Sequence, residues 1–311
     1  MGTSVDFDAL RLEVRNWSRW GKDDELGTWN LVTAEKAREA ASGIRRGVSF
    51  SLALPLWEKG PAAFGRPYGR INPVRTMTAV NHPLTESDRV CAYSDDIVTM
   101  GVQCGTHWDA LPHVSYQGAL YNGYPDTTVG PAGAARCSID RRPAVVGRGV
   151  LLDIARTRGV RRLEPHALVT SADLEAARLR AGLRLSPGDI VLVRTGQITR
   201  LTQDDDAAAY ARPAPGLAIE TAAWMHNHDI GALAIDNLAV ERPYEGDEAE
   251  VGLPLHVLAL VDMGMPLGEN FDLEALAADC AEDGVYEFWL DASPLPFVGS
   301  TGGMVNPVAV K

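Results

Sequence analysis

The chain has 311 residues, of which 46% are hydrophobic and 23% are charged, and its 29 Lys and Arg against 41 Asp and Glu leave a formal net charge of −12. This composition is typical of a globular protein with a large core and excludes wholesale disorder. The acidic balance argues against nucleic acid or an anionic membrane as the main partner, since both are bound through basic surface. We see neither a signal-peptide pattern nor the ~20 apolar residues of a membrane helix. The four scattered cysteines, without a Cys-x-x-Cys pair, indicate free thiols in a reducing cytoplasm.

In chain order, the first elements are helical and the next are strands and loops. Amphipathic spacing predicts a helix at 6–15, and Thr33 is a typical N-cap for a second helix that ends near residue 41. Between them, residues 16–30 hold three tryptophans, which either pin this arm to the body or line a substrate pocket, and packing is the favoured interpretation. Strands are predicted at 48–56, at 76–80 inside an irregular excursion over 57–84, at 89–93 and at 97–102.

The second half alternates buried strands with helices. Apolar runs predict strands at 149–154, 190–196, 231–236 and 285–290. Helices are predicted from Ser171, as the N-cap, to about residue 181 and at 220–228, 254–262 and 272–280. This alternation predicts an α/β fold with a central mixed sheet. We expect residues 1–311 to form one domain, with residues 1–47 as an arm that packs on the body or on a neighbouring subunit.

Residues 100–113 carry the clearest chemical pattern. Four polar side chains fall within eleven positions: Gln103, His107, Asp109 and His113. Imidazole, carboxylate and amide groups bind divalent metals and move protons beside them. Gly105 and Pro112 predict a shaped loop that turns these groups into one pocket. The pattern therefore predicts a metal site, whereas Cys104 is interpreted as a small packing residue.

Two further polar residues stand in apolar surroundings. His256 lies on the apolar helix predicted at 254–262, where an imidazole needs a partner or a ligand. Glu269 follows a second apolar run. Taken alone, each favours a structural role.

The run Gly-Thr-His-Trp-Asp-Ala-Leu-Pro-His at 105–113 resembles the signature His-x-Gly-Thr-His-x-Asp-x-Pro-x-His of the cyclase family that includes bacterial kynurenine formamidase and isatin hydrolase. The proline is offset by one position. The resemblance extends over most of the chain, because residues 20–28 and the pair Asn306 and Pro307 are similar to the longer, roughly 300-residue branch.

The resemblance implies a swivelling β/β/α fold and metal-dependent hydrolysis of a formamide or lactam-like C–N bond. It implies that His107 and Asp109 bind Zn or Mn, and that His113 transfers protons. His256 and Glu269 stand at nearly the spacing of the ligands of a second ion. Gln103 replaces the first ligand histidine of the family, and its amide oxygen favours harder ions such as Mn. Whether the site binds one ion or two stays open.

Several alternatives remain at this stage. The same ion could assist ring closure in natural-product synthesis, and the chain could also be a non-catalytic binding homologue. Trp108 either stacks on an aromatic substrate or braces the core, and Trp20 is a second candidate for substrate binding. The resemblance further suggests a homodimer or homotetramer, and the substrate stays open.

Overall fold

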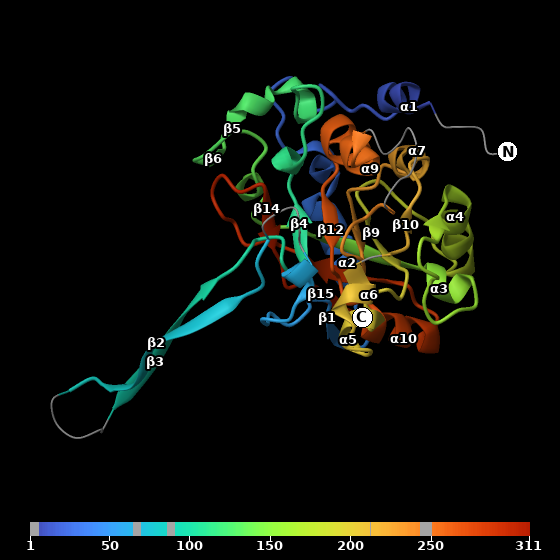
Figure 1. Cartoon of the computed structure of the whole chain (residues 1–311). Helices are drawn as coiled ribbons and strands as arrows, with labels where there is room; N and C mark the ends of the chain where they lie inside the picture. The colour runs from blue at the N-terminus through green and yellow to red at the C-terminus, as the bar shows by residue number, and fades with distance from the viewer. Residues whose placement is uncertain (1–5, 65–69, 86–90, 212, 243–250) are drawn as a thin grey trace.

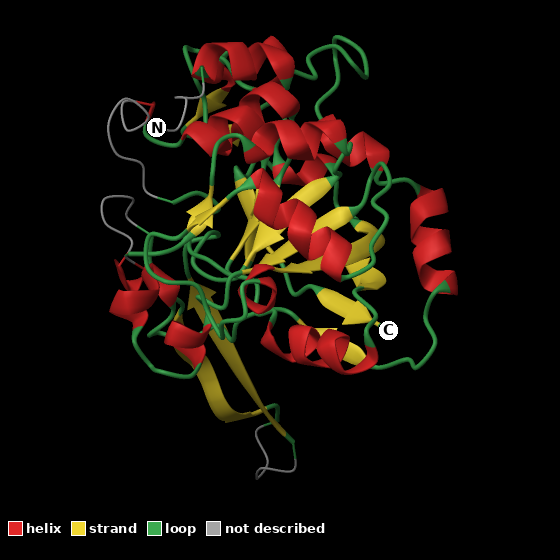
Figure 2. Cartoon of the chain, turned by 90° about the vertical axis from the view of Figure 1, so that its right-hand side faces the viewer, coloured by secondary structure: helices red, strands yellow, loops and turns green. Residues whose placement is uncertain are grey.

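The computed structural model describes residues 6–64, 70–85, 91–211, 213–242 and 251–311. Its centre is a nine-stranded mixed sheet with the strand order β1-β15-β13-β7-β9-β11-β12-β4-β14, which helices cover on both sides (Figure 2). The strands are β1 (Ser49–Ser51), β4 (His107–Asp109), β7 (Val146–Asp153), β9 (Ile190–Arg194), β11 (Ala232–Ile235), β12 (Leu267–Glu269), β13 (Glu287–Asp291), β14 (Gly302–Met304) and β15 (Val308–Val310). The expected α/β fold with a central mixed sheet is confirmed.

The helices connect the strands and cover the sheet. They are α1 (Phe7–Glu13), α2 (Ala34–Ser42), α3 (Ile154–Thr157), α4 (Ser171–Arg180), α5 (Thr199–Thr202), α6 (Ala207–Ala211), α7 (Thr221–Asn227), α9 (Pro254–His256), the π-helix η7 (Val257–Met263) and α10 (Glu274–Asp283). Short 3-10 turns are η1 (Gly27–Leu31), η2 (Pro61–Phe64), η3 (Leu111–His113), η4 (Tyr121–Gly123), η5 (Asp126–Thr128) and η6 (Ile139–Arg141). None of the helices in the described ranges is long and apolar enough to cross a membrane.

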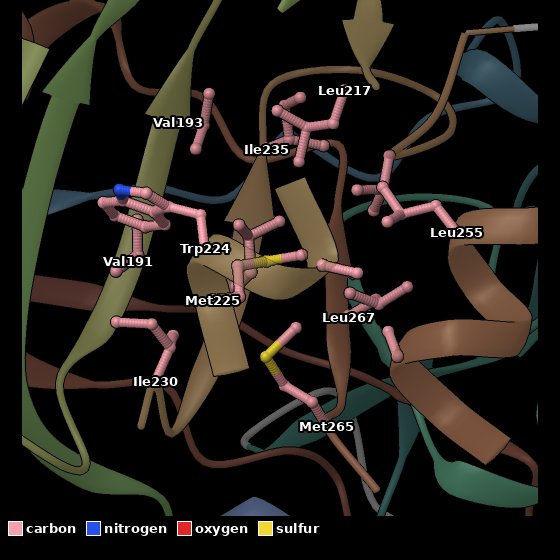
Figure 3. Packing of buried hydrophobic residues seen from close by; sticks show 14 of the residues in the cluster. Val191, Val193, Leu217, Trp224, Met225, Ile230, Ile235, Leu255, Met265 and Leu267 are labelled. Atoms are coloured by element: carbon pink, nitrogen blue, oxygen red, sulfur yellow. The ribbon is translucent and has the colours of Figure 1, made fainter. Parts of the chain in front are cut away.

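The middle of the sheet is parallel and almost entirely buried. Strands β7, β9, β11 and β12 run parallel, and their apolar side chains alternate between two cores. Val191 and Val193 face the core under α3, α4, α7, α9 and η7, whereas Leu192 faces the core under α10. Figure 3 shows the first of these cores, where Ile235 and Leu267 lie near Met225.

Some predicted boundaries are corrected by the structure. Thr170, not Ser171, is the N-cap of α4, because its side chain accepts from Asp173 N while the Asp173 carboxylate accepts from Thr170 N. The strand predicted at 48–56 is reduced to β1, and the strands predicted at 89–93 and 97–102 form one strand, β3 (Ala92–Thr99), with residues 89 and 90 outside the described ranges. The strand predicted at 76–80 is longer, forming β2 (Val74–Pro83).

Strands β2 and β3 form an antiparallel hairpin that projects far from the body of the protein (Figure 1). The hairpin exposes large apolar side chains, among them Val80, Ile97 and Val98. Exposed apolar patches of this kind mark contact surfaces in many proteins. The expected homodimer or homotetramer stays a prediction. Two smaller two-stranded sheets are β5 (Val129–Gly130) with β6 (Gly133–Ala134), and β8 (Leu168–Val169) with β10 (Gly216–Leu217).

The N-terminal arm packs on η7 of the same chain. Arg11 and Arg15 both bind the fully buried carboxylate of Asp262, at 2.8 Å and 2.9 Å. The indole of Trp17 donates to the Val261 carbonyl at 2.7 Å. Because η7 continues directly from α9, the arm braces the helix that carries His256.

Candidate metal centre

Strand β4 divides its side chains between the two layers of the protein. Successive residues of a strand point to opposite faces, so His107 and Asp109 share one face and Trp108 points to the other. Contrary to the loop expected from Gly105 and Pro112, residues 107–109 are hydrogen-bonded into the sheet between β12 and β14. A three-residue strand is too short to be recognised from alternation, and its partners lie more than 150 residues away in the chain.

The register of β4 and β12 places a second carboxylate beside the first imidazole. Glu269 stands directly opposite His107, on the same face. His107 Nε2 lies 3.3 Å from Asp109 Oδ1 and 3.6 Å from Glu269 Oε2. Single ligand atoms from these three residues all lie within 4.8 Å of one another, which is the grouping that one metal ion requires.

His256 reaches the same point from α9, on the helix layer. Its Nε2 lies 3.3 Å from Glu269 Oε1 and 3.6 Å from Asp109 Oδ2. We call His107, Asp109, His256 and Glu269 the buried cluster, because none of the four side chains is more than 4% exposed. It lies at the carboxyl end of the parallel strand β12, the edge at which open α/β sheets commonly bind ligands.

The buried cluster holds polar atoms that the protein does not satisfy. His107 Nε2 and both carboxylate oxygens of Asp109 have no hydrogen-bond partner among the described residues. Buried polar groups are normally paired, because an unpaired one costs free energy. A cation between these atoms would satisfy all of them, so the donor set fits a divalent metal.

The pKa shifts within the cluster also favour a bound cation. Burial is the largest single influence on the pKa of His107 and lowers it, but the carboxylates of Asp109 and Glu269 together outweigh burial and the net pKa is raised. Burial likewise lowers the pKa of His256, and Glu241 together with Asp109 and Glu269 raises it well above the ordinary value. Burial raises the pKa of Asp109, yet the nearby His113 and His107 hold it well below its usual range. The carboxylates that favour a proton on each imidazole equally favour a metal cation in its place.

Outer partners fix how both imidazoles face the cluster. His256 Nδ1 lies 3.0 Å from Glu241 Oε1, and Glu241 Oε2 accepts from His256 N at 3.0 Å. His107 Nδ1 lies 2.8 Å from the Gly105 carbonyl. In this arrangement each Nδ1 carries the proton and each Nε2 is left as a donor atom for a metal. Glu241 was missed by the sequence analysis, because no motif surrounds it and only the fold brings it to His256.

The other two members of the sequence motif lie at the edge of the cluster. His113 Nε2 is 3.6 Å from Asp109 Oδ1, and the His113 side chain is 20% exposed. Gln103 lies beside β14: its Nε2 donates to Thr301 Oγ1 at 3.5 Å, and a Cβ added to Gly302 would lie 2.8 Å from it. Gly302 pairs with Asp109, and its lack of a side chain leaves room for the Gln103 amide.

The two candidate substrate-binding tryptophans have different surroundings. Trp108 is fully buried, donates to the Ala292 carbonyl at 2.7 Å and packs edge-on against Phe271 and Trp29. This geometry favours its bracing role over stacking on a substrate, since neither face of the ring is open. Trp20 is half-buried in the N-terminal arm, where the Arg19 guanidinium lies 4.8 Å from its ring centre.

These observations describe an α/β protein with a buried histidine–carboxylate cluster that is suited to a divalent metal. The chain matches the model of the family described as "Putative cyclase" over residues 46–242, more than half of its length, and it belongs to that family. The resemblance found in residues 105–113 is thus confirmed.

Solved structures agree with this assignment. A structure described as a novel cyclase is 36% identical, with a TM-score of 0.86, over 96% of this chain and 99% of that one. Isatin hydrolase A from Ralstonia solanacearum is 21% identical, with a TM-score of 0.62, over 89% and 96% of the two chains. A "potential metal-dependent hydrolase with cyclase activity" is 19% identical, with a TM-score of 0.53, over 85% and 98%. The last two share the fold. No curated protein matches the sequence.

Proposed function

We propose that this protein is a metal-dependent hydrolase that cleaves an amide-type C–N bond in a formamide or a lactam-like ring. The observation that carries the proposal is the set of buried, unpartnered atoms of His107 and Asp109 beside Glu269. The isatin hydrolase and the potential metal-dependent hydrolase with the same fold support a hydrolytic reaction.

His107, Asp109 and Glu269 would hold the ion, with His256 completing the set or sharing a second ion. Imidazole and carboxylate ligands suit zinc or manganese, and a contribution from the Gln103 amide would favour manganese. When bound, such a cation supplies a Lewis acid that polarises a carbonyl and lowers the pKa of a bound water toward about 7.

His113 is suited to proton transfer at the open side of the cluster. Burial is the main cause that lowers the pKa of His113, so a neutral imidazole is available to accept a proton at Nε2. In the hydrolysis, the water oxygen bonds to the carbonyl carbon and the C–N bond breaks. His113 takes the water proton and delivers it to the leaving nitrogen. Such transfer contributes roughly 10²–10⁴-fold in rate.

The test combines metal analysis with turnover of N-formyl anilines, lactams and lactones. Wild-type protein should contain a divalent metal, lose turnover when a chelator removes it, and regain turnover on addition of Zn or Mn. His107→Ala should bind no metal and show no turnover. His82→Ala is the matched control, because His82 is an exposed histidine on the projecting hairpin and should change neither quantity. Full turnover in a metal-stripped sample would contradict the proposal.

Labelled water separates hydrolysis from the ring-closing alternative. Hydrolysis places one oxygen of ¹⁸O-water in the carboxylate product, whereas ring closure through an enolate incorporates none. A metal-loaded protein that turns over no member of the panel would instead favour a binding role.

A further inference from the structure

A cavity of about 520 Å³ lies at the amino end of the parallel strands, and we call it the amino-end cavity. Among its lining residues, Arg148 stands near the start of β7 and Ser186 lies just before β9. The buried cluster lies at the opposite, carboxyl end of this parallel set. None of the described residues that line the cavity belongs to the cluster, so the two are separate.

The apolar part of the cavity comes from two helices that end beside β13. Ala40 and Gly43 line it from the end of α2, and Val285 and Phe288 line it just after α10. Val285 is exposed, whereas Phe288 belongs to the core under α10. Small-molecule sites have volumes of roughly 300–1,000 Å³ and combine an apolar surface with a few polar groups. The cavity therefore has the size and the apolar surface for a small organic ligand.

Positive charge gathers at this cavity, although the chain as a whole has a formal net charge of −12. Six cationic side chains line it: Lys36, Arg45, Arg46, Arg148, Arg184 and Lys311. Three carboxylates line it as well: Glu39, Asp283 and Glu287. Like charges close together repel one another, so such a group is stable only with carboxylates or a bound anion among its members.

Carboxylates hold three of these cations in place. Arg148 Nη1 lies 2.6 Å from Oδ2 of the fully buried Asp189. Lys311 Nζ lies 2.7 Å from Asp283 Oδ1, and Arg46 Nη2 lies 3.1 Å from Asp283 Oδ2. These ion pairs fix the shape of the cavity without a ligand.

Arg45 and Arg184 are the two cations that no carboxylate holds. Both are exposed, and neither makes an ion pair with any residue in the described ranges. Their backbones are nevertheless anchored at the cavity. The Arg184 carbonyl accepts from Arg148 Nη1 at 3.2 Å, and Arg45 directly precedes Arg46, whose N donates to the Lys311 carbonyl at 3.1 Å. Two guanidinium groups thus remain available beside an apolar surface.

This combination selects the chemistry of the ligand. The planar fork of N–H donors on a guanidinium matches a carboxylate or a phosphate, and hydrogen bonds between charged groups are the strong ones. An apolar surface beside it favours a hydrocarbon or aromatic body, through the area removed from water. The matching ligand therefore carries an anionic group on an apolar body.

We propose that the amino-end cavity binds a small organic anion, with Arg45 and Arg184 binding its carboxylate or phosphate and Val285 and Phe288 contacting its apolar body. The inference does not depend on the proposed hydrolytic function, because the cavity and the metal centre share no residue.

A matched pair of fluorescent probes tests the proposal on the full chain. Anilinonaphthalene sulfonate is an aromatic anion, and N-phenyl-naphthylamine has the same rings without the sulfonate. Wild-type protein should bind the anionic probe more tightly. Replacing both arginines, Arg45→Gln with Arg184→Gln, should raise the Kd of the anionic probe about 10- to 100-fold and leave that of the neutral probe nearly unchanged. The control is Arg38→Gln with Arg180→Gln, which removes two exposed charges outside the cavity lining and should change neither Kd.

An unchanged Kd of the anionic probe in the first double variant, or an equal rise in the control, would overturn the proposal. Competition with naphthoate and with naphthyl phosphate then identifies the anionic group, and displacement by neither would also count against the site. The titration is repeated in His107→Ala. An unchanged Kd there supports a site apart from the metal centre, whereas lost binding would place the anion at the buried cluster and reject the cavity.

Discussion

The two faces of β4 differ in how their buried groups are satisfied. On one face, Trp108 has a hydrogen-bond acceptor for its N–H and two aromatic neighbours, Trp29 and Phe271. On the other, His107 and Asp109 are equally buried but keep atoms without any partner among the described residues. Within this one three-residue strand, Trp108 is thus fully partnered in the core, whereas its two neighbours keep the atoms that we propose bind a metal. A complete set of partners marks the structural face, and an incomplete set marks the candidate site.

The largest expected effect comes from the structural face. Trp108→Ala removes a fully buried indole and should destabilise the protein by about 3–5 kcal/mol, measured as the free energy of unfolding in urea. Trp108→Phe should cost less, because most of the ring volume stays. In either variant, the metal content per folded molecule should match wild type. Loss of metal with unchanged stability would break the division between the two faces.

A smaller effect, on metal affinity, is expected from Glu241, which contacts His256 on the side away from the cluster. Glu241→Gln removes the charge that orients His256 through Nδ1, and should weaken metal affinity about 10- to 100-fold in a chelator competition assay. Glu282→Gln, an exposed carboxylate on α10, serves as the control. If Glu241→Gln kept the metal affinity of wild type, the contact between Glu241 and His256 Nδ1 would not contribute to metal binding.

The smallest expected effect is a pH dependence of stability and of metal affinity at the face of β4 that carries His107 and Asp109. The pKa values of His107 and His256 are raised above the ordinary 6.5 by the adjoining carboxylates. In metal-free protein, the stability from their protonation is fully present below that value and is lost as pH rises through the raised pKa. Metal binding displaces these protons, so metal affinity should instead rise over this window. Melting temperatures from about pH 6 to about pH 9, with and without metal, check both slopes; parallel slopes would count against a metal at these imidazoles.

Local sequence was sufficient wherever the deciding interactions are local. The apolar runs at 190–196 and 231–236 are strands because continuous burial in a parallel sheet requires such runs. The ligand-type residues at 107 and 109 could be found because they belong to a group of four polar side chains within eleven positions of the chain. Their family resemblance carried the remaining chemistry, including His256 and Glu269, whose own surroundings favoured a structural role.

Only the tertiary structure decided which distant residues meet at the cluster. β4 lies between β12 and β14, both far along the chain, and this pairing turns an expected loop into a strand and brings Glu269 opposite His107. Glu241 carries no local pattern and becomes relevant only because the fold places it beside His256 on α9. The physical reason is that periodicity and motifs report a residue's neighbours along the chain, whereas hydrogen-bond partners and charges are set by contacts across the folded layers.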